Sequence, residues 1–272
     1  MTVCEQHETQ VRKVRGEETG TQCIQRSFSV MRLLASASRQ GLKLVDVASA
    51  LDLSHPTAHR ILKALENEGV VERVRGSRRY TIGSETTWLG LVAAERFPIT
   101  AAAAPVLEKL SSVVGDSVFL AVPSLNESVY ADRRLGSYPV QTTTLAVGTR
   151  RPMGLSVAGR AMMAFMPDRK VDTILAANSR RFESYGCNSE TVLEGMRQTR
   201  MRGYLYAASM TAREKRVISV PVLDMGGAPI AAISVIAQSH RLPETRVPRL
   251  VPNMRAAAQD ISRVLTERAF AA

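Results

Sequence analysis

The chain of 272 residues is long enough for about two domains. Its composition, 45% hydrophobic and 22% charged, is that of a globular protein with ample apolar material for a core. No apolar run approaches the roughly 18 residues that cross a bilayer, and the N-terminus lacks the apolar stretch of a secretory signal, so we expect a cytoplasmic protein. The formal net charge of +11 favours a polyanionic partner, of which nucleic acid is the usual one.

The first 83 residues predict a tail followed by a small domain of helices and one hairpin. Residues 1–22 are polar, charged and aperiodic, which is typical of a disordered segment. Apolar residues at helical spacing then predict helices from Gln25, within 42–53, and from Ser54 to about Glu68. Two short strands rich in Val, Ile, Tyr and Arg flank a turn signal at Gly76. Three helices followed by a basic hairpin are the outline of a winged helix-turn-helix over residues 23–83.

Residues 84–97 predict a linker helix that Pro98 ends, and the character of the chain changes after it. Helices and strands then alternate up to residue 272, and two of the strands are joined across the hairpin signal "MGGA". This order indicates an α+β domain with an antiparallel sheet, over residues 98–272. The expected helices are 101–115, 156–166, 168–178, 189–203 and most of 245–270, and the expected strands are 117–123, 128–134, 216–224 and 229–237.

The stretch "HPTAHR", residues 55–60, opens the third predicted helix and sets the main question about function. On a helical wheel the apolar residues of this helix cluster on one face, at the spacing of a core-facing stripe. His55 lies close to the edge of that face, so the wheel separates it from His59. The opposite face and its flanks carry polar side chains and a proline, namely Pro56, Thr57, His59, Arg60, Lys63 and Asn67.

Two histidines four positions apart on a helix can bind zinc, but the pattern here lacks what that chemistry needs. A zinc-protease helix carries a glutamate between its histidines as the general base, and Pro, Thr and Ala stand there in this chain. No third ligand is evident, because the other histidines, His7 and His240, lie in a tail and a distant loop. The three cysteines, Cys4, Cys23 and Cys187, form no metal-binding pair either. We therefore expect no metal and no other cofactor.

Recognition of DNA fits the same helix better. The N-terminal part of a recognition helix faces base edges in the major groove, where Arg60 can pair with guanine through two hydrogen bonds. Pro56, Thr57, His59 and Lys63 share that surface and lie within reach of bases or phosphates. The predicted wing adds a cluster of arginines suited to phosphates or the adjacent minor groove, comprising Arg73, Arg75, Arg78 and Arg79.

The stretches "QRSFSVMRLL", "LKLVDVASALDLSHPTAHRILKALENEGVVERV" and "RRYTIGSETTWLG" resemble the winged helix of the IclR family of bacterial transcription regulators. Downstream, "VGTRRPMGLSVAGRAMMAFMP", "RQTRMRGY" and "VISVPVLDMGGAPIAAISV" extend the resemblance to about residues 24–268. The resemblance implies a repressor or activator that assembles as a homodimer or homotetramer on a near-palindromic operator. It also implies a GAF-like effector-binding domain that responds to a small organic or aromatic compound.

Carried over from the family, the effector pocket is formed by the turn into the "SVAGRA" helix, the segment after "RGY" and the last two strands. Family members that bind small carboxylic acids tend to carry polar groups where this chain has Ala207, Val217 and Ile236. The difference favours a larger or more apolar effector, or none. The residues that the resemblance assigns to the pocket are Val140, Thr143, Val157, Ala158, Ala207, Val217, Ser234 and Ile236.

Two other functions remain open. "GLSVAG", residues 154–159, is one residue off the G-x-S-x-G elbow of serine hydrolases, and Asp224 and His240 follow Ser156 in hydrolase order. However, no buried strand is predicted before Ser156, so a helix cap is the simpler role for its hydroxyl and we expect no enzyme activity. The other alternative is a DNA-binding protein whose C-terminal domain only forms oligomers.

Overall fold

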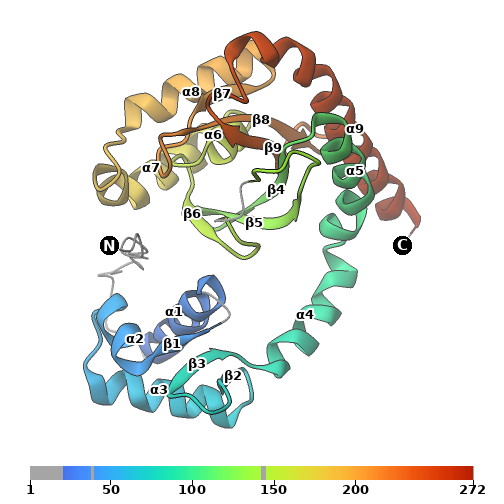
Figure 1. Cartoon of the computed structure of the whole chain (residues 1–272). Helices are drawn as coiled ribbons and strands as arrows, with labels where there is room; N and C mark the ends of the chain where they lie inside the picture. The colour runs from blue at the N-terminus through green and yellow to red at the C-terminus, as the bar shows by residue number, and fades with distance from the viewer. Residues whose placement is uncertain (1–20, 38–39, 142–144, 272) are drawn as a thin grey trace. The chain divides into compact units, whose positions relative to one another are not determined.

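The computed structural model of the chain describes residues 21–37, 40–141 and 145–271 (Figure 1). The predicted tail and Thr143 therefore lie outside the described residues, apart from residues 21–22. The chain divides into two compact units at the bond between Phe97 and Pro98. Within the described ranges no single helix is long and apolar enough to cross a membrane, although two helices taken together across a break, 84–96 and 99–114, pass that test.

The N-terminal unit consists of helices and a three-stranded antiparallel sheet in the order β1-β3-β2. Three helices and the β2–β3 hairpin match the sequence prediction, whereas the two-residue strand β1 was not predicted. A winged helix-turn-helix is thus confirmed. The elements are α1 (Gln22–Ser36), β1 (Leu42–Lys43), α2 (Leu44–Ala50), α3 (His55–Asn67), β2 (Val71–Arg73), β3 (Arg79–Ile82) and α4 (Ser84–Arg96).

Two glycines with positive φ shape this unit. Gly41 precedes β1 with φ of 69°, and a Cβ there would meet the Tyr80 carbonyl oxygen of β3 at 2.4 Å. Gly76, with φ of 72°, forms the turn between β2 and β3, as its sequence signal predicted. The core between the helices and the sheet is small and consists of Val30, Leu33, Leu34, Val47, Ile61, Leu62, Val71 and Tyr80.

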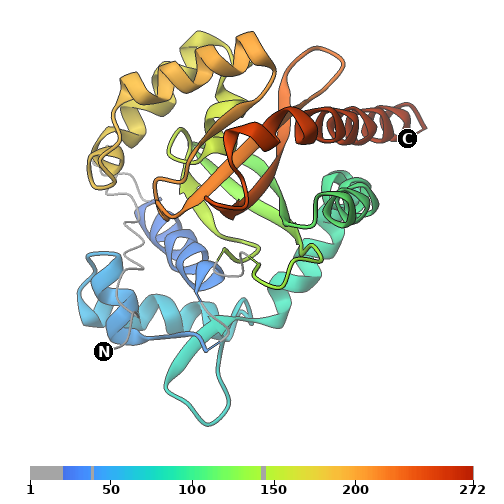
Figure 2. The same cartoon turned by 45° about the horizontal axis from the view of Figure 1, so that its top comes forward.

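The C-terminal unit is built on a six-stranded antiparallel sheet in the order β6-β5-β4-β9-β8-β7. Both faces of the sheet are covered: α5 and α9 lie against one face, and α6 lies against the other with α7 and α8 beyond it (Figures 1 and 2). Its elements are α5 (Ile99–Val114), β4 (Ser117–Ser124), β5 (Glu127–Arg134), β6 (Arg150–Pro152), α6 (Val157–Met163), α7 (Asp168–Glu183), α8 (Ser189–Arg202), β7 (Leu205–Ala208), β8 (Lys215–Leu223), β9 (Pro229–Gln238), η1 (Glu244–Arg246) and α9 (Val247–Ala271).

Both faces of the sheet are buried, so the sequences of its central strands are continuous apolar runs and do not alternate between apolar and polar residues. In β9, Ile233 and Val235 face the α5–α9 side, whereas Ala232 and Ile236 face the α6 side. The α+β class and the antiparallel sheet of this unit are confirmed. The edge strands β6 and β7 were not predicted.

Candidate DNA-binding interface

Helix α3 has the beginning that the sequence predicted. Ser54 is its N-cap, and the Thr57 backbone N–H donates to the Ser54 hydroxyl oxygen at 3.4 Å. The two hydroxyl oxygens of Ser54 and Thr57 lie 2.8 Å apart, which holds the first turn together. Pro56 stands in that turn, where its missing N–H leaves no helical hydrogen bond unmade. The helix is buried through Ala58, Ile61 and Leu62.

The face opposite this buried stripe carries the predicted DNA-binding side chains of α3. Pro56, His59, Arg60 and Lys63 are exposed, and Thr57 is half-buried against its cap. His55 is exposed as well, so the expectation that it lies near the buried face is wrong. The wheel treats the first residue as part of a regular stripe, but the buried residues of α3 begin only at Ala58.

A charged network joins α3 to the wing. The Lys63 ammonium lies 3.3 Å from one carboxylate oxygen of Glu66, and the Arg73 Nε lies 3.2 Å from the other. Arg73 also donates to the Tyr80 hydroxyl at 2.8 Å across the β2–β3 pair, and its guanidinium lies over the Tyr80 ring. Glu66 therefore orients one cation on the recognition helix and one on the wing.

The role of Glu66 and Tyr80 was not foreseen from the sequence, although one signal could have found it. A hairpin closed at Gly76 places Arg73 directly opposite Tyr80, and that register follows from the turn. The strand register alone therefore makes the Arg73 guanidinium and the Tyr80 ring neighbours.

The arginines of the wing differ in what they can do. Arg75 and Arg78 are exposed in the turn around Gly76. Arg79 is half-buried, and its Nη1 donates to the Gly41 carbonyl oxygen at 2.9 Å, which ties β3 to the segment before β1. Of the four predicted wing arginines, Arg73 and Arg79 thus have contacts inside the unit, while Arg75 and Arg78 expose their guanidinium groups to solvent.

The zinc site and the serine-hydrolase site considered from the sequence can be compared with the described residues. No group of three His, Cys, Asp or Glu side chains suited to a metal ion occurs in the part of the chain that the structure describes. Ser156 is 9% exposed, accepts a hydrogen bond from the Gly159 N–H at 2.9 Å, and pairs with the Ser128 hydroxyl at 2.9 Å. It is the N-cap of α6. The Tyr130 hydroxyl is a further hydrogen-bond partner of this side chain, and these contacts are those of a buried helix cap.

Most of the predicted effector residues gather on the α6 side of the sheet. Val157, Ala158, Val217 and Ile236 are buried in the core cluster there, and Ala207 packs against its edge. The Ser234 hydroxyl lies in the same layer and is paired with the Ser219 hydroxyl at 2.7 Å. Val140, in contrast, is exposed in the segment between β5 and β6. Side chains of this set fill the layer between α6 and the sheet.

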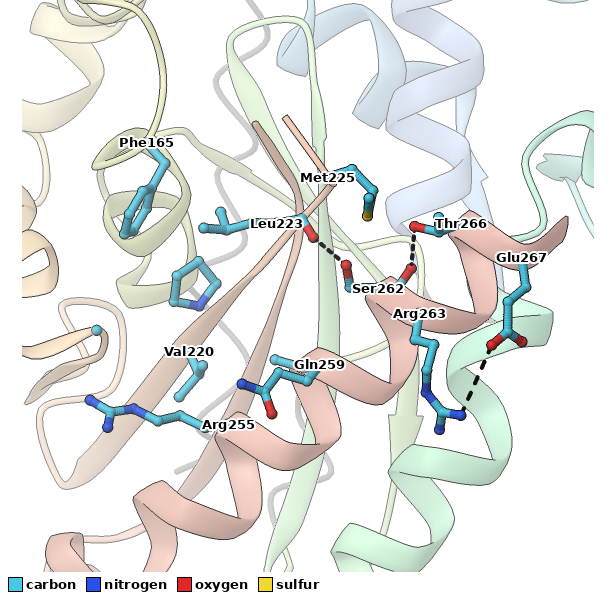
Figure 3. Close-up of a pocket in the computed structure, with 13 residues that line it drawn as sticks. Phe165, Val220, Leu223, Met225, Arg255, Gln259, Ser262, Arg263, Thr266 and Glu267 are labelled. Carbon is cyan, nitrogen blue, oxygen red and sulfur yellow. Dashed lines mark hydrogen bonds and ion pairs between the residues drawn. The ribbon is translucent and has the colours of Figure 1, made fainter. Parts of the chain in front are cut away.

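Two surface hollows lie on the described part of the C-terminal unit. One, of about 450 Å³, lies along α9 beside β8 and is lined by Val220, Leu223 and Met225 from the sheet side (Figure 3). Polar residues of α9 line the other side, where Ser262 donates to the Leu223 carbonyl oxygen at 2.6 Å. The second hollow, of about 600 Å³, lies beside α8 and β7 and includes Ala207.

Comparison with known proteins agrees with this architecture. Residues 24–75 match the IclR helix-turn-helix domain, and residues 92–263 match the C-terminal domain of the bacterial transcriptional regulator IclR. The glycerol operon regulatory protein of Streptomyces coelicolor is 28% identical over 245 residues, which cover 90% of this chain and 95% of that protein.

Solved structures show the same fold. An IclR transcriptional regulator from Alicyclobacillus acidocaldarius superposes with a TM-score of 0.72 at 21% identity, covering 89% of this chain and 97% of the other. An IclR homolog from Microbacterium hydrocarbonoxydans, complexed with 4-hydroxybenzoate, gives a TM-score of 0.70 at 22% identity, covering 90% and 99%.

The winged helix and the α+β unit together define a transcriptional regulator of the helix-turn-helix class. Since the two domain matches span most of the chain, it belongs to the IclR family of bacterial transcriptional regulators, as its sequence resemblance implied.

Proposed function

We propose that this regulator binds a near-palindromic operator with α3 in the major groove. The observation that carries the proposal is the face of α3 opposite Ala58, Ile61 and Leu62, which presents Arg60, His59 and Lys63 to solvent. Arg60 would read guanine, since a guanidinium matches its two acceptors. Acting on chromosomal DNA, the protein would work in the cytoplasm.

Arg75 and Arg78 would contact phosphates beside the groove that α3 enters, because the wing is adjacent to the helix in sequence and joined to it through Glu66. Such contacts supply affinity without reading sequence. The proposed roles of Arg60 in reading bases and of Arg78 in contacting phosphates can be tested directly.

Arg60→Ala is expected to cost about 1–3 kcal/mol of binding to the specific operator and to relax its sequence preference, whereas Arg78→Ala should weaken all sequences alike and lower the salt slope by about one. Mobility-shift titrations with DNA from upstream of the protein's own gene, at several salt concentrations, measure both. Arg169→Ala, an exposed arginine of the C-terminal unit, is the matched control. Unchanged operator preference in Arg60→Ala would remove that residue from the interface.

We infer that the protein works as a homodimer, or a tetramer built from dimers, whose contact includes α4. None of the residues of α4 is buried within one chain. The exposed apolar side chains of this helix and its end are Trp88, Leu89, Leu91, Val92 and Phe97. Contiguous apolar surface of this kind marks interfaces, and a second copy would also match the symmetry of a palindrome.

Val92→Glu is expected to shift dimer towards monomer by about 2 kcal/mol or more, because it places a charge on the apolar surface of α4. Sedimentation velocity across a concentration series measures the shift. Thr87→Glu adds the same charge to an exposed polar position of α4 and should change the association little. Equal association of wild type and Val92→Glu would exclude α4 from the interface.

We also propose that a small organic or aromatic effector acts through the C-terminal unit, in keeping with the homolog that was crystallised with 4-hydroxybenzoate. The predicted pocket residues on the α6 side of the sheet are its proposed contacts. The close packing of Val157, Val217 and Ile236 favours a second candidate, in which this unit only forms oligomers. Calorimetry against a panel of organic and aromatic acids tests whether this unit binds an effector. Operator binding with each ligand found then tests whether that ligand controls the protein, as a unit that only forms oligomers would not allow.

A further inference from the structure

One carboxylate in the proposed DNA-binding surface is shared by two cations from different elements. Glu66 lies in the last turn of α3, and strand β2 starts at Val71, shortly after that helix ends (Figure 1). The Glu66 Oε2 atom lies 3.3 Å from the Lys63 ammonium, and the Oε1 atom lies 3.2 Å from the Arg73 Nε. Both carboxylate oxygens are therefore engaged, one by the recognition helix and one by the wing.

Helix stability does not account for a glutamate at this position. A negative charge in the last turn of a helix opposes the helix dipole, which favours cations there. The pair of Lys63 and Glu66 also has the less favourable order, because a helix gains more when the glutamate stands on the N-terminal side of the lysine. The distinguishing feature of Glu66 is therefore its effect on the two cations.

The arginine of this group is fixed by the core of the N-terminal unit. Besides its contact with Glu66, the Arg73 Nη2 donates to the Tyr80 hydroxyl at 2.8 Å, and the guanidinium carbon lies 5.1 Å from the centre of the Tyr80 ring. Tyr80 is only 4% exposed and belongs to the apolar core. Glu66 thus links the long, flexible side chain of Lys63 to a position on the wing that the core holds in place.

Both cations are nevertheless accessible to DNA. The side chain of Lys63 is 57% exposed and that of Arg73 is 48% exposed, whereas the Glu66 side chain between them is 23% exposed. Lys63 lies one helical turn after Arg60, the proposed base-reading residue, on the same face of α3. The proposed interface therefore contains two cations whose charge and reach are limited by one carboxylate.

We propose that Glu66 is a positioning residue that sets the sequence specificity of DNA binding by restraining Lys63 and Arg73. Binding to arbitrary DNA depends almost wholly on cations that reach phosphates in many registers. The shared carboxylate lowers the charge that the two cations offer and keeps them in one arrangement, so it weakens this sequence-independent binding.

Binding to the operator responds differently to the same restraint. There α3 and the wing occupy a single register, and side chains that are ordered before binding lose less entropy on forming the complex. Glu66 therefore raises the ratio of the affinity for the operator to the affinity for other DNA. The inference rests on the proposed operator binding, and its test separates the two.

Selection from a library of random DNA duplexes with the full-length wild-type protein comes first, because it gives the preferred sequence directly. A wild-type protein that enriches no sequence would refute operator binding itself, and this inference with it. Fluorescence anisotropy then measures the affinity of each variant for the selected duplex and for a shuffled duplex of the same length and composition. The quantity compared between variants is the ratio of these two affinities.

Two substitutions of Glu66 separate its charge from its reach. Glu66→Gln keeps the size of the side chain and removes the charge, so it should lower the affinity ratio roughly tenfold, mainly through tighter binding of the shuffled duplex. The salt dependence of that binding should steepen by about one unit, as one more cation reaches a phosphate. Glu66→Asp keeps the charge but is too short to contact both cations. It should lower the ratio roughly two- to tenfold through weaker binding of the selected duplex, with the salt dependence unchanged.

Glu72→Gln is the matched control. Glu72 is an exposed residue of β2 beside Arg73, and its side chain points to the other face of the strand. Its replacement removes the same charge from the wing, so it should tighten the binding of both duplexes alike and leave the ratio within about twofold of wild type. An equal fall of the ratio in Glu72→Gln and Glu66→Gln would show a general effect of charge and overturn the proposal.

A double variant tests whether Glu66 acts through the wing. In an Arg73→Gln background the contact is already broken, so adding Glu66→Gln should change the ratio by less than about twofold. An undiminished effect would refute the restraint of Arg73. A wild-type ratio in Glu66→Gln would overturn the proposal while leaving operator binding in place. If Glu66→Gln does not fold by circular dichroism, Glu66→Asp decides, since an unchanged ratio in that variant has the same meaning.

Discussion

Leu62→Ala is expected to destabilise the N-terminal unit by about 2–5 kcal/mol and to abolish operator binding while the C-terminal unit stays folded. Leu62 is fully buried on the inner face of α3. Among the described residues, the apolar cluster that contains it has eight buried side chains. A unit of this size has a free energy of unfolding of about 5 kcal/mol, so one cavity can remove most of it.

Hydrogen exchange on the full-length protein can separate the two units, because peptides report on each separately. Peptides from 21–37 and 40–97 should exchange faster in Leu62→Ala, and those from 98–141 and 145–271 should match wild type. Val45→Ala removes apolar atoms from a residue that is 53% exposed and serves as the control. Loss of protection in both units would show that they unfold together.

The recognition helix was predictable from sequence because its signals are local. Ser54 can cap only a helix that starts beside it, Pro56 suits the first turn, and the stripe of Ala58, Ile61 and Leu62 sets the buried face. The wing followed from Gly76 for the same reason. These features depend on neighbours within a few residues, so sequence patterns capture them.

The edge strands escaped prediction because they have few residues and little pattern. Strand β6 is the three residues Arg150–Pro152, and β7 is the four residues Leu205–Ala208. Each exists because a longer neighbour, β5 or β8, presents unpaired backbone groups to it. Helix α7 also runs on to Glu183, past the expected end at residue 178, because Phe182 is buried in the core.

The same contrast between local patterns and distant contacts applies to the candidate sites. Exposure of Arg60 and Lys63 follows from helical periodicity, but the tie between Glu66 and Arg73 needs the hairpin register. The effector residues named by resemblance remain a prediction, since family position does not reveal how tightly a layer is packed.

An ion cluster around the buried Asp116 joins the connection between α5 and β4 to the connection between β9 and α9. Asp116, 2% exposed, directly precedes β4 and accepts from Arg246 Nη1 at 2.5 Å and from Arg241 Nη2 at 3.4 Å. Arg246 also donates to the Val114 carbonyl oxygen at 2.6 Å, and the Arg241 guanidinium lies over the Tyr138 ring. A single carboxylate thus compensates two guanidinium groups that belong to the connection between β9 and α9.

Asp116→Ala is therefore expected to destabilise the C-terminal unit by about 3–5 kcal/mol, because it leaves two cations close together without their shared anion. Urea unfolding measures the loss in free energy of unfolding. Hydrogen exchange in peptides of 98–141 and 145–271 assigns that loss to the C-terminal unit. Asp260→Ala is the matched control: its pair with Arg263, at 2.9 Å, is exposed on α9 and should be worth less than about 1 kcal/mol. Arg246→Met combined with Asp116→Ala should recover part of the loss, since it removes one of the two unpaired cations. Equal effects of Asp116→Ala and Asp260→Ala would show that burial adds nothing to this cluster.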